Sequence, residues 1–226
     1  MNKNLALLPT VAAVLAISAC ADQSVSGPTL DASRSAATAN VRSGLELHPS
    51  GFGEHSYAAW KAQEGRPDSR GNANMALYFQ KFTATTTPAA GIAVISGVEG
   101  LPLSAITGLS WEHRIDGWCG AGAPRWTFIL ADPAGNRAVV HLGCAEAIHS
   151  PTDDPNWIRD SYPGFAIGGA IQPLDPEFDE SVATISQLLI VFDEGNEFGP
   201  TSGFVYLDNI TVNGKVFTSP GDNGAN

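Results

Sequence analysis

The feature that most constrains the fold is the pair Asn213-Gly214, which separates two short apolar runs near the C-terminus, Phe204–Val212 and Lys215–Phe217. Asn and Gly both accept the positive φ angles of a type I′ turn, and such a turn joins two antiparallel strands. We therefore expect the chain to close with a β-hairpin, where a β-sandwich carries its last strands.

The preceding segments also favour strands. Residues Ile106–Asp116 alternate with period two, which places Leu109, Trp111 and His113 on one face. The 24 Gly and 15 Pro supply turns between such runs, and no segment has the pattern of a long helix. We expect an all-β fold, a single antiparallel β-sandwich of jelly-roll type over residues 44–217.

Two segments are expected to lie outside the sheets. Residues Glu146–Pro176 are polar and rich in proline, which predicts a long loop with one short strand near Phe165–Ile171. Residues 218–226 are polar and predict a disordered tail.

The N-terminus carries an export signal. A single cation, Lys3, precedes the apolar stretch Leu5–Ala19, which is too short to span a membrane but suits a signal peptide. The stretch ends in Ile17-Ser18-Ala19-Cys20, which resembles the lipobox of bacterial lipoproteins. The alternative is ordinary secretion with a chance cysteine.

The lipobox resemblance implies a membrane anchor. Residues 1–19 would be the signal peptide, and Cys20 would carry acyl chains such as palmitate, several of which make a stable anchor. Residues 20–43 follow as the lipidated cysteine and a flexible tether rich in Ala, Ser and Thr. Ala21 follows the cysteine, which by analogy with the family favours the outer membrane in an organism that has one.

The other two cysteines, Cys119 and Cys144, are expected to form a disulfide in an exported chain. If the turn at Asp132–Asn136 centres a hairpin, Cys144 lies opposite about Pro124, a few residues from Cys119. A metal pair is the alternative, but the sequence offers no further ligands at a suitable spacing.

The charge disfavours nucleic acid as a partner. The formal net charge is −11, and the four lysines form no basic run that would neutralise phosphates. The acidity fits solubility or, alternatively, recruitment of calcium. Three acidic clusters are calcium candidates, with solvated turn residues as the alternative: Asp153-Asp154, Asp175–Glu180 and Asp193–Glu197.

The common enzyme motifs are absent from the sequence: it has no GxSxG, HExxH, phosphate loop or GxGxxG. A glycosidase needs two placed carboxylates. The residues considered for that role are Glu112, Asp193, Glu194 and Glu197. We therefore expect no enzyme, with a glycan hydrolase or lyase as the less favoured alternative.

Residues Phe204–Thr211, FVYLDNIT, resemble the final strand of jelly-roll carbohydrate-binding modules and galactose-binding-like domains. The resemblance implies a noncatalytic sugar-binding module in which exposed Trp and Tyr rings stack on sugars. It also implies that Asp208 helps to hold a structural calcium ion.

Aromatic residues in loops are the expected ligand contacts, since a large side chain there has no obvious core partner. These candidates are Trp118, Trp157 and Tyr162. The strand residues Trp60, Trp111 and Trp126 are expected in the core instead.

The preferred interpretation is a surface-anchored lipoprotein whose noncatalytic β-sandwich binds a glycan or another extracellular ligand. The alternative is a structural or adhesion lipoprotein that recognises protein or envelope partners.

Overall fold

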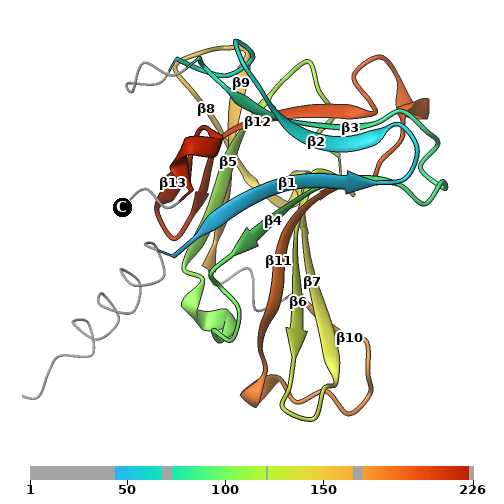
Figure 1. The fold of residues 1–226 in the computed structure, drawn as a ribbon, viewed down its shortest axis with the longest axis vertical. Coiled ribbons are helices and arrows are strands. Elements are labelled where there is room, and N and C mark those ends of the chain that lie inside the picture. Colours follow the sequence, from blue (N-terminus) through green and yellow to red (C-terminus); the bar gives the residue numbers. More distant parts are fainter. Residues whose placement is uncertain (1–43, 68–72, 121, 165–169, 224–226) are drawn as a thin grey trace, which may run out of the picture.

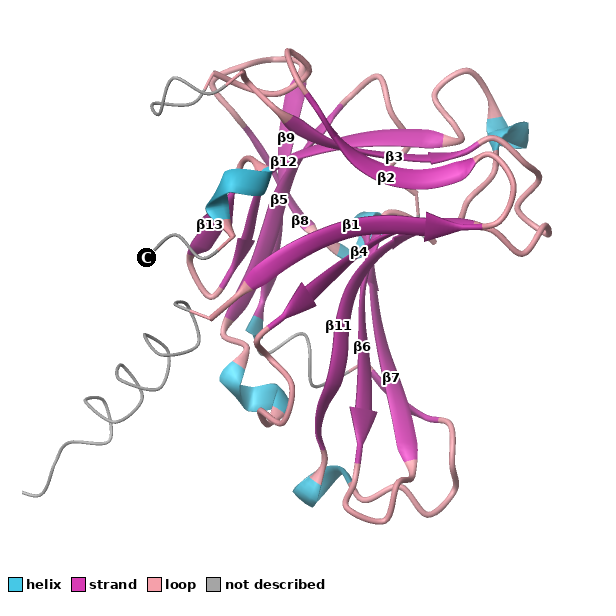
Figure 2. Cartoon of the chain, in the orientation of Figure 1, coloured by secondary structure: helices cyan, strands magenta, loops and turns pink. Residues whose placement is uncertain are grey.

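A computed structural model describes residues 44–67, 73–120, 122–164 and 170–223. These residues form two antiparallel sheets, with only short 3-10 turns as helical structure (Figure 1, Figure 2). The chain crosses between the sheets at most of its connections. The expected fold class, an antiparallel β-sandwich of jelly-roll type, is confirmed.

The first sheet has six strands. Its order of neighbours is β1 (Glu46–Phe52), β4 (Ala90–Ser96), β11 (Thr184–Phe192), β6 (Arg125–Ala131), β7 (Arg137–Gly143) and β10 (Ile171–Pro173).

The second sheet has seven strands. Its order of neighbours is β2 (Ser56–Lys61), β3 (Ala76–Lys81), β12 (Phe204–Val212), β5 (Gly108–Arg114), β9 (Trp157–Pro163) and β8 (Ile148–Pro151), and β13 (Lys215–Phe217) pairs with β12.

The core lies between the sheets, and its centre is a stacked pair of indoles. Trp111 of β5 lies 5.0 Å from Trp126 of β6, ring centre to ring centre, and both side chains are fully buried. The alternation expected along β5 is present: Leu109, Trp111 and His113 are buried on the inner face. Trp60 is partly buried and packs against the same core.

The closing hairpin forms as predicted. Asn213 and Gly214 have φ angles of 50° and 82°. The Asn213 side chain also ties the hairpin to the rest of the sheet, because its Oδ1 accepts from the Thr107 amide at 2.7 Å and its Nδ2 donates to the Ala105 carbonyl at 2.8 Å. The hairpin therefore closes the second sheet and fixes the loop before β5.

A buried lysine fastens the sheets at one end. Lys81 is 1% exposed, and its ammonium donates to the carbonyl oxygens of Thr85, Thr87 and Asp193, each at 2.8 Å. Three carbonyl dipoles thus stabilise a cation that burial alone would disfavour.

The expectation of one long loop over Glu146–Pro176 was wrong. The region Glu146–Pro176 contains β8 and β9 rather than one long loop, because its polar residues pair along an edge of the second sheet. Of the strand expected near Phe165–Ile171, residues 165–169 lie outside the described residues, and β10 begins at Ile171.

The expected tail is ordered up to residue 223. The buried carboxylate of Asp222 accepts from the Thr218 amide at 2.6 Å and the Ser219 amide at 2.9 Å. The Leu47 amide of β1 donates to the Asn223 side chain at 2.8 Å. These contacts hold residues 218–223 against the first strand.

The expected signal peptide, Cys20 and tether, residues 1–43, lie outside the described residues. Within the part of the chain that is described, no helix has the length and apolar character to cross a membrane.

Candidate functional site

Four aromatic side chains gather on the outer face of the second sheet, and we call them the aromatic row: Tyr57, Tyr78, Tyr206 and Phe204. Alternation along β12 produces this face, because Val205 and Leu207 are fully buried in the core and their neighbours point outward. The register places Tyr206 directly opposite Tyr78 of β3, and β2 next to β3 supplies Tyr57.

The rings of the row touch one another. Tyr78 is central: its ring centre lies 4.7 Å from Tyr206, 5.8 Å from Tyr57 and 6.3 Å from Phe204. Phe204 and Tyr206 are 6.1 Å apart in an edge-to-face arrangement. These are the distances at which aromatic pairs stabilise each other. Tyr78 is 8% exposed, and the other three rings are partly exposed.

A cation lies at each end of the row. The Lys61 ammonium is 5.3 Å from the ring centre of Tyr57 and 5.6 Å from that of Tyr78. The Arg114 guanidinium is 3.7 Å from the ring centre of Tyr206. All three distances are within the range of a cation–π interaction.

Two carboxylates fix Arg114 over Tyr206. The guanidinium donates to Glu64 Oε2 at 2.6 Å and to Asp116 Oδ1 at 2.7 Å. Burial lowers the pKa of Arg114, but the hydrogen bonds that it donates to these two carboxylates outweigh that effect, and the net pKa is raised. Burial also raises the pKa of Tyr78 and Tyr206. The row is therefore neutral at its rings and charged at its ends.

A polar cluster adjoins the row on the same face, centred on Glu112 of β5. This carboxylate is 1% exposed and accepts from Arg66 at 2.6 Å, Arg159 at 2.5 Å and Asn209 at 3.0 Å. Burial raises the pKa of Glu112, but these hydrogen bonds overcome that effect and the net pKa is lowered. Arg66 also pairs with Asp153. Glu112 is thus a charged structural group with its donors already in place.

Asp208, the expected calcium ligand, is buried beside this cluster. Its oxygens accept from the Arg66 amide at 2.7 Å and the Asn209 amide at 2.6 Å. Burial outweighs these bonds and raises its pKa to about 6. Among the described residues Asp208 belongs to no group of three or more His, Cys, Asp or Glu side chains that would hold one ion. Calcium takes six to eight oxygen ligands, to which backbone carbonyls and water also contribute, and calcium binding at Asp208 stays a prediction.

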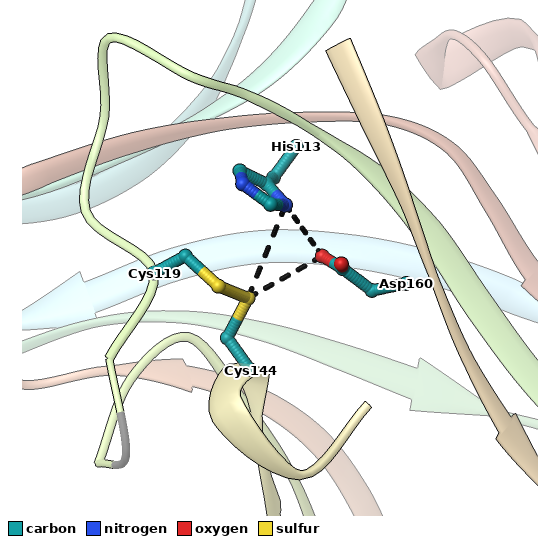
Figure 3. Close-up of side chains that lie close together, drawn as sticks. All are labelled: His113, Cys119, Cys144 and Asp160. Atoms are coloured by element: carbon teal, nitrogen blue, oxygen red, sulfur yellow. Dashed lines mark hydrogen bonds and ion pairs between the residues drawn. A yellow bond between two sulfur atoms is a disulfide. The ribbon is translucent and has the colours of Figure 1, made fainter. Parts of the chain in front are cut away.

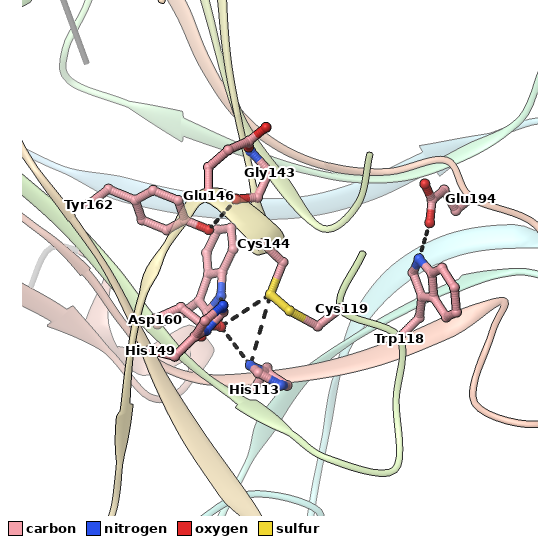
Figure 4. The surroundings of a disulfide bond; sticks show 11 residues. His113, Trp118, Cys119, Gly143, Cys144, Glu146, His149, Asp160, Tyr162 and Glu194 are labelled. Carbon is pink, nitrogen blue, oxygen red and sulfur yellow. Dashed lines mark hydrogen bonds and ion pairs between the residues drawn. A yellow bond between two sulfur atoms is a disulfide. The ribbon is translucent and has the colours of Figure 1, made fainter. Parts of the chain in front are cut away.

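The three aromatic residues expected in loops do not converge. Trp157 and Tyr162 belong to β9 and are 4% and 2% exposed, so the expectation that they lie in loops was wrong. They are five residues apart on one strand and therefore point to opposite faces of the sheet. Figure 4 shows the Tyr162 hydroxyl donating to the Gly143 carbonyl, at 3.0 Å. Neither side chain is available to contact a ligand in this conformation.

Trp118 lies in a loop, as expected, but it has local partners. Its ring stacks on Phe198 with centres 5.6 Å apart, and its indole donates to Glu194 (Figure 4). The Trp118 amide donates to the Phe204 carbonyl at 2.8 Å. Trp118 is partly buried against the core, so local packing accounts for its position.

The carboxylates considered for glycosidase chemistry are all engaged. Asp193 pairs with Arg125 at 2.5 and 2.7 Å, and Glu197 accepts from the Thr85 amide at 2.7 Å. Glu194 accepts from Trp118, and Glu112 is held by two arginines. Each of these four carboxylates therefore already accepts a hydrogen bond from a donor within the protein.

The disulfide between Cys119 and Cys144 is confirmed, with the two Cα atoms 5.3 Å apart. It lies against a buried polar group (Figure 3). Asp160, which is fully buried, accepts from Trp111 at 2.7 Å, and its Oδ2 lies 2.6 Å from His113 Nδ1 and 3.3 Å from Cys144 Sγ. His149 Nδ1 lies 2.7 Å from the other Asp160 oxygen.

A hollow of about 410 Å³ lies at the other end of the second sheet's outer face. Its lining includes Ser110 of β5, Ser161 of β9, Ile148 of β8 and Thr211 of β12. Polar hydroxyls and one exposed apolar side chain thus continue the outer face beyond the polar cluster.

Comparison with known proteins gives a similarity of fold. No family model matches the sequence. No curated protein matches it either.

Solved structures that resemble the chain include the family 11 carbohydrate-binding module of a cellulosomal cellulase of Clostridium thermocellum. The sequence identity is 11% and the TM-score is 0.42, over 74% of this chain and 86% of the module. The same family 11 module was solved in complex with a β-1,3-1,4-mixed-linked tetrasaccharide; it has 12% identity and a TM-score of 0.38, covering 75% of this chain and 88% of that one.

A family 30 module of another cellulosomal cellulase of that organism has 14% identity and a TM-score of 0.37, covering 73% of this chain and 96% of the module. Identities and TM-scores this low assign neither a ligand nor a binding face to the present chain.

The aromatic row is the feature that the sequence analysis missed. Its signal was the alternation in Phe204–Asp208, which already separates Phe204 and Tyr206 from the core residues between them. The sequence did not indicate that β3 would pair with β12 and bring Tyr78 to the same place.

Proposed function

We propose that the protein is a noncatalytic binding module that takes a glycan chain on the outer face of its second sheet. The observation that carries the proposal is the aromatic row, four contiguous rings across three neighbouring strands with Lys61 and Arg114 at its ends. At the usual spacing of about 4.8 Å between strands, the row extends over roughly 10 Å of sheet.

The chemistry of the row suits a sugar ring. A sugar has an apolar C–H face and a polar rim, and a Tyr side chain likewise has an apolar face with a polar tip. Polar groups that could fix a ligand's orientation lie beside the rings: the Lys61 ammonium, the Arg114 guanidinium and the Gln80 amide. The oxygen of that amide accepts a hydrogen bond from the Tyr78 hydroxyl at 3.2 Å. Apolar area with a few placed polar groups is the usual composition of a ligand site.

The module is proposed to act without catalysis. The carboxylates beside the row, Glu112 and Asp208, are 1% and 2% exposed and are held by guanidinium and amide donors, so neither reaches a ligand on the row to act as its acid or base.

We also propose that the module is displayed on a membrane through lipid on Cys20. The support is the lipobox sequence, and the tether over residues 20–43 would let the binding face reach its ligand. Incorporation of labelled palmitate tests this anchor: we expect labelling of the wild type and none of Cys20→Ser. Labelling of the variant would overturn the anchor and leave the binding proposal untouched.

Electrophoresis in native gels, each containing one polysaccharide of a broad panel, tests the binding face. We expect at least one polysaccharide to retard the wild type. In that gel Tyr206→Ala and Tyr57→Ala should migrate freely. The matched control is Phe52→Ala, which removes an exposed ring (52% exposed) from the first sheet. Equal retardation of all four proteins would overturn the assignment of the face.

A protein partner is the second candidate, because Tyr and Arg are enriched at the energetic centres of protein interfaces and Arg114 stacks on Tyr206 in the row. This candidate corresponds to the adhesion alternative. It predicts no retardation on any glycan of a broad panel, together with a crosslinked envelope protein that Tyr206→Ala loses.

A further inference from the structure

The four atoms that surround the disulfide have the composition of a zinc site. Cys119 Sγ, Cys144 Sγ, His113 Nδ1 and one oxygen of Asp160 all lie within 4.8 Å of one another (Figure 3). Among the described residues this is the one group of three or more His, Cys, Asp or Glu side chains gathered closely enough to hold an ion. Two thiolates, an imidazole and a carboxylate are all ligands that zinc accepts.

Apart from the two sulfurs, which are bonded to each other until the disulfide is reduced, the ligand atoms lie at distances close to those around a tetrahedral ion. Bond lengths of about 2.0–2.3 Å place neighbouring ligand atoms about 3.4–3.8 Å apart. Cys144 Sγ is 3.3 Å from Asp160 Oδ2 and 4.0 Å from His113 Nδ1. His113 and Asp160 are 2.6 Å apart and would separate by less than an ångström as an ion replaced the hydrogen bond between them.

Outer contacts hold the carboxylate in place. Trp111 donates its indole N–H to Asp160 Oδ2, and His149 contacts Oδ1. Such outer partners orient metal ligands in established zinc sites. Asp160 and Cys144 are fully buried and His113 is 5% exposed, whereas Cys119 is partly exposed, so the site opens toward solvent on the Cys119 side.

We propose that in the reduced chain Cys119, Cys144, His113 and Asp160 bind one zinc ion, so that the same position accepts either a disulfide or a metal as its crosslink. A trialkylphosphine and one water molecule convert the disulfide into two thiols and the phosphine oxide. The phosphine loses two electrons, the water oxygen goes to phosphorus, and its two protons go to the sulfurs. Zinc binding then releases both thiol protons to solvent.

The two crosslinks differ in when each can form. The disulfide needs an oxidising compartment, and zinc binding needs the thiols of a chain that has not yet been oxidised. Either one joins the loop at Cys119 to the turn that follows β7, and zinc would also join both to strands β5 and β9, which carry His113 and Asp160. The Cys119 loop would therefore be crosslinked in both redox states, and the two sheets would be joined through zinc in the reduced one.

The test uses the full chain with Cys20→Ser, which removes the third thiol. The protein is reduced anaerobically with a phosphine, mixed with zinc, freed of excess by gel filtration and assayed for metal. We expect one zinc per chain after reduction and none without it. Cobalt should give the absorption of a thiolate-ligated tetrahedral ion, which His113→Gln weakens. His48→Gln, which changes a histidine of β1 outside this group, should retain the metal.

Zinc content equal to that of Cys119→Ser/Cys144→Ser would overturn the proposal. The proposal also fails if reduction unfolds the chain and zinc does not restore the fluorescence of the buried indoles. Restoration of that fluorescence by one equivalent of zinc would support it.

Discussion

Tyr78 lies directly opposite Tyr206 across the β3–β12 pair, with 4.7 Å between ring centres. Tyr78 also contacts Tyr57 on one side and Phe204 on the other. One ring thus supports the other three, and it is the least exposed of the four.

Tyr78→Ala should therefore abolish glycan binding and also destabilise the fold by about 2–4 kcal/mol, since it removes a buried ring and leaves a cavity. Tyr78→Phe keeps the ring and loses only the hydroxyl bond to Gln80. We expect Tyr78→Phe to bind within a factor of about 5 of the wild type, at the usual cost of about 1 kcal/mol or less for one hydrogen bond. Isothermal titration and urea unfolding measure the two effects. Loss of binding in Tyr78→Phe would argue against stacking as the source of affinity.

Arg114→Met should weaken binding by about 2- to 10-fold without unfolding the protein, because a cation–π contact at a partly exposed site contributes about 0.5–1 kcal/mol and also fixes the Tyr206 ring. Lys61→Met is the matched control. Its ammonium is farther from its rings, so we expect a smaller effect. A larger loss in Lys61→Met than in Arg114→Met would contradict the geometry of the row.

Deprotonation of Asp208 should lower the free energy of unfolding as the pH rises. Its folded pKa of about 6 lies above its ordinary value of 3.8. Between these two values the unfolded chain has released the proton while the folded chain still holds it, so folding is favoured at low pH and loses up to about 3 kcal/mol by pH 7. In Asp208→Asn this loss is absent, so the variant should gain stability relative to the wild type between pH 4 and pH 6.

Urea unfolding of both proteins across that pH range measures the difference. Parallel curves would show that Asp208 titrates normally. Added calcium tests the expected ligand role of Asp208: a shift of the wild-type curve alone would identify Asp208 as a ligand, and no shift in either protein would contradict that role.

Reduction of the disulfide without metal should destabilise the protein by about 3–4 kcal/mol, the chain-entropy value for a separation of 25 residues. For a domain of this size that corresponds to a fall in Tm of about 10 °C. Calorimetry of Cys119→Ala/Cys144→Ala, with a chelator present, measures it. A fall of only one or two degrees would show that the surrounding contacts already fix this loop.

Lys81→Met should destabilise the fold by about 3–5 kcal/mol, because three buried carbonyl oxygens lose their donor at once. Lys215→Met gives the comparison on β13, where the ammonium contacts the Leu45 carbonyl at 2.8 Å and the residue is partly exposed. Equal losses in the two variants, read from urea midpoints, would contradict the special role of the buried cation.

Local sequence signals predicted the parts of the fold that depend on local geometry. The Asn213-Gly214 turn needs only two residues that accept positive φ, and the alternation in β5 needs only neighbours along one strand. The disulfide followed from two cysteines near the ends of one hairpin.

The unpredicted parts depend on partners distant in sequence. Strand β9 contains the polar run Arg159–Ser161, which looks like a loop until β5 brings Trp111 and His113 into contact with Asp160. The sequence showed no further metal ligands for the cysteines for the same reason. His113 and Asp160 come near them only through the pairing of β5 with β9. Tyr57, Tyr78 and Tyr206 likewise become one surface only when three separate strands align.

That alignment makes the aromatic row a reporter of completed folding. Tyr57 belongs to β2 and Tyr206 to β12, so the surface does not exist until the chain has been synthesised past β12 and these distant strands have paired. A fragment that lacks β12 would have no partial affinity. For a chain that crosses a membrane before it folds, ligand recognition would begin only after export is finished.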